Sequence, residues 1–236
     1  MPDGAILHDP RVSGPWTLTR FLPETWREAG RLREEAVGGR GTVVFVASEE
    51  GAGEDWALRH YHRGGLPGRL LDDRFAWTGA ALTRSFLEWR LLRRLHNDGL
   101  PVPRPVAAAY RRQGATYTAD LITARIPGAQ PLVAHLARGP VPADAWRRLG
   151  RCIRRFHDAG VFHADLNVHN LLLDESSRPW LLDFDRGRMR QPGGWRRANL
   201  ERFARSLRKS KAMNDAIHVA PADWSALLSG YGQMPA

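Results

Sequence analysis

A short polar loop between two apolar segments constrains this chain more than any other feature. Residues 162–170 read Phe-His-Ala-Asp-Leu-Asn-Val-His-Asn and follow a segment with an apolar helical pattern. Two short apolar segments come next, Leu171 to Leu173 and Trp180 to Leu182, and their lengths predict a strand hairpin. Asp183-Phe184-Asp185 stands at the end of the second strand. The fold must therefore gather acidic and amide side chains between one helix and one hairpin.

These side chains have the chemistry that phosphoryl transfer requires. The reaction needs a carboxylate that accepts the proton of the acceptor hydroxyl, and oxygen ligands that fix magnesium on the phosphates. We expect Asp165 to be the catalytic base, and Asn170 with Asp183 to hold Mg²⁺. Asp and Asn are also common in turns, so a turn without chemistry is the alternative interpretation. His163 is expected to orient the loop backbone rather than to react.

Hydrophobic patterning predicts the other elements of the chain. Strands are expected over residues 41–47, 56–61 and 117–126, and helices over residues 83–97, 144–160 and 199–213. Asp144 is expected to cap the second helix and Gly160 to end it. Pro127-Gly128 predicts a turn between two lobes, which gives the expected bounds 1–126 and 127–236.

Size and composition allow a globular protein with an anionic partner. The chain has 236 residues, of which 43% are hydrophobic, and a formal net charge of +10. Such a charge fits nucleic acid, acidic lipid or a phosphorylated substrate, and does not choose among them. Neither a signal peptide nor a membrane-spanning helix is predicted. The single Cys152 is expected to be buried on a helix, which suits a reducing compartment.

The polar loop and the Asp183-Phe184-Asp185 triplet resemble the catalytic loop and metal-binding triplet of protein kinases and related small-molecule phosphotransferases. Asp185 stands where glycine is usual in that triplet, which leaves open whether it shares the metal. The resemblance implies an ATP-dependent enzyme of the α+β class with two lobes. The N-terminal lobe would be an antiparallel sheet with one helix, and the C-terminal lobe would be mainly helical.

The same resemblance assigns nucleotide-binding residues to the N-terminal lobe. Arg59 in Ala57-Leu58-Arg59 aligns with a strand cation that is usually lysine, and Glu88 aligns with its helix partner. The only lysines are Lys209 and Lys211, so a cation in this lobe must be arginine or histidine. Gly39 and Gly41 belong to a glycine-rich loop that would cover the nucleotide, although a simple turn explains them equally well.

A closer resemblance covers roughly residues 38–230. The segments that carry it are residues 58–65, 99–105, 163–170 and 180–185, and together they resemble the 3-deoxy-D-manno-octulosonic acid (Kdo) kinase family. That family implies transfer of the ATP γ-phosphate to the 4-hydroxyl of Kdo on a lipid A precursor, in building the lipopolysaccharide inner core. It also implies peripheral attachment to the cytoplasmic face of the cell inner membrane, whose anionic leaflet attracts basic surfaces.

The substrate would carry a carboxylate and phosphates, which arginine binds well. Four arginines are candidates for this contact: Arg63, Arg69, Arg74 and Arg84. A solvated basic face is the alternative explanation for them. Two other functions stay open, a phosphotransferase for aminoglycoside or choline-like compounds and an inactive kinase fold or nucleic-acid-binding module. No nucleic-acid-binding motif and no protein partner is evident in the sequence.

Overall fold

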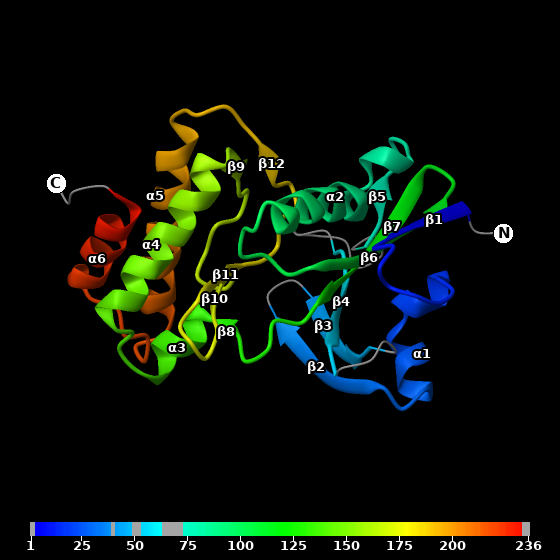
Figure 1. Ribbon diagram of the computed structural model, residues 1–236, viewed down its shortest axis with the longest axis horizontal. Helices are drawn as coiled ribbons and strands as arrows, with labels where there is room; N and C mark the ends of the chain where they lie inside the picture. The colour runs from blue at the N-terminus through cyan, green and yellow to red at the C-terminus, as the bar shows by residue number, and fades with distance from the viewer. Residues whose placement is uncertain (1–2, 39–40, 49–52, 63–72, 233–236) are drawn as a thin grey trace. The chain divides into compact units, whose positions relative to one another are not determined.

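The computed structural model describes residues 3–38, 41–48, 53–62 and 73–232. The chain divides into two compact units (Figure 1). Unit 1 comprises Met1–Arg94 and Pro103–Arg125, and unit 2 comprises Leu95–Val102 and Ile126–Ala236. The sheet of the first half of the chain lies in unit 1, and unit 2 holds most of the helices.

Unit 1 is built on one antiparallel sheet with the strand order β1-β6-β7-β4-β3-β2, and β5 pairs with β7. The strands are β1 Asp3–His8, β2 Leu32–Gly38, β3 Gly41–Ala47, β4 Asp55–His60, β5 Phe75–Ala76, β6 Pro105–Gln113 and β7 Thr116–Ala124. The predicted strands correspond to β3, β4 and β7 and are confirmed to within two residues. The proline-rich passage that follows α2 leads into β6, which begins at Pro105.

Helical elements cover both faces of this sheet. On one face, η1 (Leu18–Phe21) and α1 (Pro23–Glu28) contribute Trp26, whose ring meets that of Trp56 edge-on at 5.8 Å. On the other face lies α2 (Arg84–Asn97), preceded by η2 (Ala80–Leu82), where Phe86 packs edge-on against Tyr110. Side chains alternate along a strand, so Trp56 in the first core leaves Arg59 of β4 on the α2 face.

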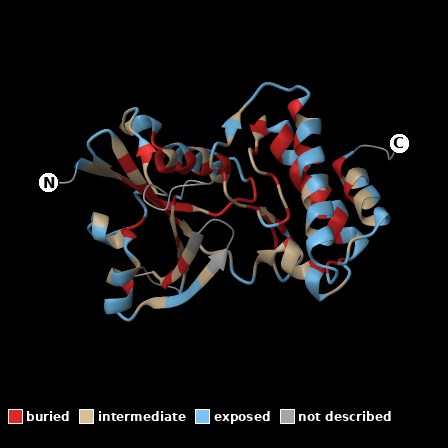
Figure 2. Cartoon of the chain, turned by 180° about the vertical axis from the view of Figure 1, so that it is seen from behind, coloured by how far each residue is buried: buried red, intermediate tan, exposed pale blue. Residues whose placement is uncertain are grey.

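Unit 2 contains the helices α3 (Leu132–Arg138), α4 (Ala143–Asp158), α5 (Trp195–Met213) and α6 (Pro221–Tyr231). Its short strands form two small sheets, β11-β10-β8 and β12-β9. Their bounds are β8 Gln130–Pro131, β9 Val161–Phe162, β10 Leu171–Leu173, β11 Pro179–Leu181 and β12 Arg188–Met189. The predicted hairpin is the β10–β11 pair, and the predicted helices are α4 and α5. Figure 2 shows the buried residues on the sides of these helices that face one another.

The start of α4 differs from the prediction. Asp144 was expected to cap the helix, but the helix begins at Ala143 after Pro142, and no side chain caps it. Pro142 occupies the N-cap position and has no polar side-chain atom that could cap the helix, so Asp144 lies within the first turn. It pairs there with Arg148, four residues on, at 2.7 Å. The predicted end is confirmed, because α4 stops at Asp158 and Gly160 has a φ of 74°.

Helices α4 and α6 approach each other so closely that their backbones touch. A Cβ atom added at Gly150 would lie 2.0 Å from the carbonyl oxygen of Leu227, and one added at Gly230 would lie 2.1 Å from that of Arg147. Only glycine fits at either position. Cys152 on α4 is buried as expected, and burial raises the pKa of its thiol to about 12, so the thiol stays protonated.

Candidate active site

The side chain of His163 links the predicted catalytic loop to the strand end beside it. Its Nε2 donates to the carbonyl oxygen of Leu182 at 2.8 Å, and its Nδ1 accepts from the backbone N–H of Asp165 at 3.2 Å. Accepting at Nδ1 requires a neutral ring, and burial lowers the pKa of His163 in agreement with this. These hydrogen bonds confirm that His163 orients the loop backbone.

Amide side chains close the loop around Asp165. The Nδ2 groups of Asn167 and Asn170 donate to the carbonyl oxygen of Asp165, at 3.1 and 2.9 Å. The Oδ1 atom of Asn167 accepts from the backbone N–H groups of His169 and Asn170, at 2.8 and 3.1 Å. Leu166, fully buried, fixes the loop to the core of unit 2. The loop is therefore a closed turn with a defined position for each polar side chain.

One face of α5 supplies three further contacts to this loop. Asn199 donates its Nδ2–H to the carbonyl oxygen of His163 at 3.0 Å, and Ser206 Oγ accepts from the backbone N–H of Val168 at 2.9 Å. Between them, Arg202 reaches the carboxylate of Asp165 at 3.3 Å. The spacings of three and four residues place Asn199, Arg202 and Ser206 on one side of the helix. These three residues were not assigned from the sequence, although polar residues three and four positions apart on an amphipathic helix could have indicated a shared polar face.

The Asp183 end of the hairpin is tied to the same loop. The backbone N–H of Leu182 donates to the carbonyl oxygen of Asn170 at 2.9 Å, and Phe184 is buried with its ring edge-on to His163 at 4.9 Å. Asp183 has a φ of 59°, a left-handed conformation that is uncommon for residues other than glycine. The structure thus brings the loop that carries Asp165 and Asn170 together with the strand end that carries Asp183.

The chemistry of these side chains fits a magnesium ion. Because the Nδ2 end of Asn170 donates to the loop, its Oδ1 is the end available as a ligand. In the described part of the chain, no three His, Cys, Asp or Glu side chains form a metal-binding group. Mg²⁺ bound to nucleotide uses one or two protein carboxylates and takes its other ligands from phosphates and water, and the donor set of Asp183 and Asn170 fits such an ion.

In unit 1, Arg59 and Glu88 form a buried ion pair. Arg59 Nη2 lies 2.5 Å from Glu88 Oε2, and the hydroxyl of Tyr61 donates to the same oxygen at 2.5 Å. The Glu88 side chain is 2% exposed and that of Arg59 is 25% exposed. The structure therefore joins β4 to α2 through the two residues that the sequence analysis paired.

The two predicted glycines belong to the β2–β3 connection. Gly41 is the first residue of β3 and pairs with Gly38 across the hairpin. Gly39 lies outside the described residues, so its predicted contact with the nucleotide stays a prediction.

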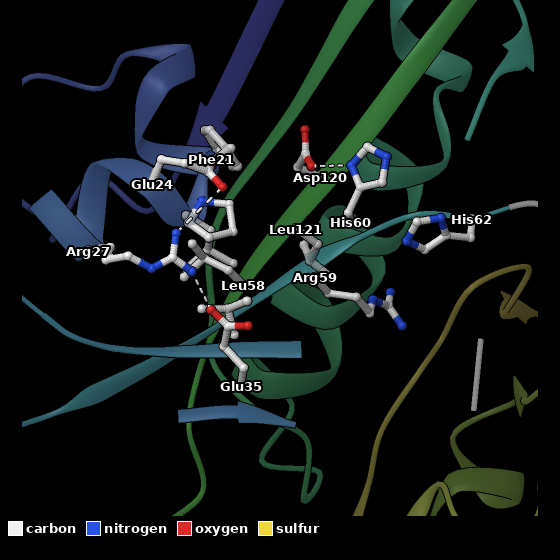
Figure 3. A pocket seen from close by; sticks show the side chains of 13 residues that line it. Phe21, Glu24, Arg27, Glu35, Leu58, Arg59, His60, His62, Asp120 and Leu121 are labelled. Atoms are coloured by element: carbon white, nitrogen blue, oxygen red, sulfur yellow. Dashed lines mark hydrogen bonds and ion pairs between the residues drawn. The ribbon is translucent and has the colours of Figure 1, made fainter. Parts of the chain in front are cut away.

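Unit 1 also contains a cavity of about 290 Å³, shown in Figure 3. An ion pair between Arg27 and Glu35 lies at one side of it, and His60 with Asp120 lies at the other. The hydrogen bond to the Asp120 carboxylate, 2.6 Å from Nδ1, raises the pKa of His60. Among the described site residues, Arg59 is the one that borders this cavity.

A solved kinase structure shares this fold. The Rio2 kinase of Chaetomium thermophilum, determined as an ADP/Mg²⁺-phosphoaspartate complex, matches with a TM-score of 0.51 at 18% identity. The match covers 89% of this chain and 70% of the Rio2 chain. At that identity the likeness concerns the fold alone, and it confirms the predicted protein-kinase-like α+β fold.

Sequence relatives identify the family. Proteins named 3-deoxy-D-manno-octulosonic acid kinase are 42% identical in Actinobacillus succinogenes, over 90% of both chains, and 44% identical in Xylella fastidiosa, over 92% of this chain and 86% of the relative. The protein of that name from Stenotrophomonas maltophilia is 41% identical over 97% of this chain and 89% of its own length. The family profile matches residues 23–231, and the chain therefore belongs to the lipopolysaccharide kinase (Kdo/WaaP) family.

Proposed function

We propose that this kinase transfers the γ-phosphate of ATP to the 4-hydroxyl of a Kdo sugar on a lipid A precursor. The relatives that match most of the chain are named as kinases of this sugar. The observation that carries the proposal is the loop around Asp165, whose backbone is held by His163 and Asn170 and whose carboxylate meets Arg202. A fixed carboxylate of this kind can accept the proton of a sugar hydroxyl as the oxygen attacks phosphorus.

The other site residues have complementary roles in the proposal. Asn170 and Asp183 would hold Mg²⁺, as in a kinase fold that binds a magnesium nucleotide. The bound ion would neutralise charge on the phosphate oxygens. Arg59, held by Glu88, would contact the phosphates, and Gly39 with Gly41 would let the backbone of the β2–β3 connection approach them.

Arginines of unit 1 are proposed to bind the acceptor's carboxylate and phosphates. Of the candidates, Arg74 and Arg84 lie in the described part of the chain, whereas Arg63 and Arg69 lie outside it. The planar guanidinium of Arg84 sits over the ring of Phe75 at 4.6 Å, a contact that limits its motion. A guanidinium positioned in this way suits a forked contact with a carboxylate.

We further propose peripheral attachment to the cytoplasmic face of the cell inner membrane. None of the helices in the described ranges is both long enough and apolar enough to cross a bilayer. The formal charge of +10 favours an anionic leaflet, to which each nearby Lys or Arg adds about 1 kcal/mol of attraction.

The direct test is to incubate the purified protein with ATP, MgCl₂ and Kdo-bearing lipid A precursor and to analyse the product by mass spectrometry. We expect a mass increase of one phosphate, located on the Kdo residue by fragmentation. Asp165→Asn should slow formation of the product by about 10² to 10⁴, and Asp215→Asn, a carboxylate-to-amide change at an exposed position, should leave the rate unchanged. Phosphate on the lipid A portion, or on an aminoglycoside or choline instead, would contradict the assigned acceptor.

A further inference from the structure

A groove of about 470 Å³ runs between α5 and α6 in unit 2. Its floor is apolar and includes Leu200 from α5 with Trp224 and Leu228 from α6. Trp224 is partly exposed, and its ring packs at 6.3 Å from the buried ring of Phe203. The groove thus presents an aromatic side chain whose position is fixed by the core beneath it.

The rim of this groove is positively charged. Arg205 and Arg208, both exposed, line it from α5, and neither forms an ion pair within the ranges that the structure describes. Arg197 also lines it, but its charge is matched by Glu201, which it meets at 2.8 Å. Two guanidinium groups one helical turn apart therefore stand over an apolar floor without a matching carboxylate.

We propose that this α5–α6 groove binds a phosphate-bearing lipid of a bilayer surface, an inference that rests on the proposed lipid-linked acceptor. The arginines suit the phosphate of a lipid head group, and the apolar floor with Trp224 suits the glycerol and upper acyl region beneath it. A free phosphate would use the arginines alone and would leave the apolar floor in water. The combination of charge and apolar area selects the membrane lipid.

The same helix, α5, contributes residues both to the α5–α6 groove and to the contacts with the catalytic loop. At 100° per residue, Asn199, Arg202 and Ser206 cluster on the side of α5 that faces the catalytic loop, and the mean direction of Arg205 and Arg208 lies about 120° around the helix from that side. The groove and the loop thus lie on different sides of the same helix, whose diameter is about 10 Å. This arrangement suits a sugar whose reactive hydroxyl stands away from the lipid surface.

Vesicle binding tests the inference. The full-length protein is sedimented with vesicles of phosphatidylcholine alone and with vesicles that also contain phosphatidylglycerol. We expect binding to the anionic vesicles, and about a thirtyfold weaker partition for Arg205→Ala/Arg208→Ala, from roughly a fivefold loss per arginine. Trp224→Ala should also weaken vesicle binding, and the size of this loss should be the same at high and low salt, because the lost contact is apolar. Arg147→Ala/Arg151→Ala, a double change with the same loss of charge at exposed positions on α4, is the matched control.

Several results would overturn the inference. Equal losses in the two double variants would mean a general basic surface rather than this groove. Competition by soluble glycerol phosphate as effective as vesicles would assign the site to free phosphate, and stronger retention by RNA than by vesicles would assign it to nucleic acid. The proposed function is tested separately with a detergent-dispersed acceptor, on which the Arg205→Ala/Arg208→Ala variant should keep its activity. Inactivity of the wild type on that acceptor would contradict the function and leave the vesicle result standing.

Discussion

The ion pair between Arg59 and Glu88 predicts that stability and catalysis respond differently to the same substitutions. In Arg59→Met, the Glu88 carboxylate, 2% exposed, loses its ion pair with the Arg59 guanidinium and stays buried. Removing one partner of a buried pair costs about 3 to 5 kcal/mol, because the remaining charge is not compensated. The Tyr61 hydroxyl still donates to Glu88, so we expect about 3 kcal/mol. For a chain of this size, that corresponds to a melting temperature lower by about 6–12 °C.

A second substitution separates the two effects. Glu88→Gln in the Arg59→Met background removes the buried charge, so most of the lost stability should return. ATP use should not return, because the cation that we propose contacts the phosphates is still missing. Arg59→Lys should keep part of both properties, since it keeps the charge but loses the forked geometry.

Thermal unfolding and the KM for ATP are the two measurements. Arg33→Met is the control, because Arg33 is 59% exposed and its ion pair with Asp55 is long, at 3.7 Å, so the change should cost less than about 1 kcal/mol. An Arg59→Met variant as stable as the wild type would contradict the predicted cost of the buried Glu88 charge. A double variant that regains ATP use together with stability would contradict the separate role of Arg59 in ATP use.

Four further predictions concern unit 2. Asp165→Ala should lower kcat by about 10² to 10⁴ in the phosphorylation assay, and full activity would remove its role as base. Arg202→Ala should lower kcat about ten- to a hundredfold with little change in the KM for ATP, with partial recovery in Arg202→Lys, because it positions the Asp165 carboxylate. Burial lowers the pKa of His157 to about 4, so the unfolded chain binds its proton first as the pH falls below about 6.5. Its contribution to stability should thus be about 2 kcal/mol smaller at pH 5 than at pH 8, and denaturant unfolding of His157→Gln should lack that difference. Gly150→Ala should cost at least about 2 kcal/mol in denaturant unfolding because its Cβ meets a carbonyl of α6, whereas Gly194→Ala, with open space around it, should be neutral.

The sequence was most informative where a local pattern determines the structure. The β10–β11 hairpin was predicted because its apolar strands are short and adjacent in the chain. The loop from His163 to Asn170 was recognisable because its function depends on residue types at fixed spacing. The ion pair of Arg59 and Glu88 followed from the resemblance to kinases, and the structure adds that the carboxylate is buried.

Long-range pairing was not visible in the sequence. Strand β1 pairs with β6 about a hundred residues away, and its sequence, Asp-Gly-Ala-Ile-Leu-His, has no clear alternation. In β6 the initial proline and the alanines hide a strand that is buried on both faces. Asn199 and Ser206 were missed for a related reason, because their partners in the loop lie 36 and 38 residues earlier.

The order of these contacts along the chain has a consequence for synthesis on the ribosome. Residues 163–168 leave the exit tunnel well before Asn199, Arg202 and Ser206, which arrive 36 to 38 residues later. Until then the emerging segment lacks the hydrogen bonds that Asn199 and Ser206 make to its backbone, and Asp165 lacks its arginine. A nascent chain halted before α5 would therefore carry Asp165, Asn170 and Asp183 without the contacts that α5 supplies to their loop, and we expect catalytic competence only once α5 has been translated.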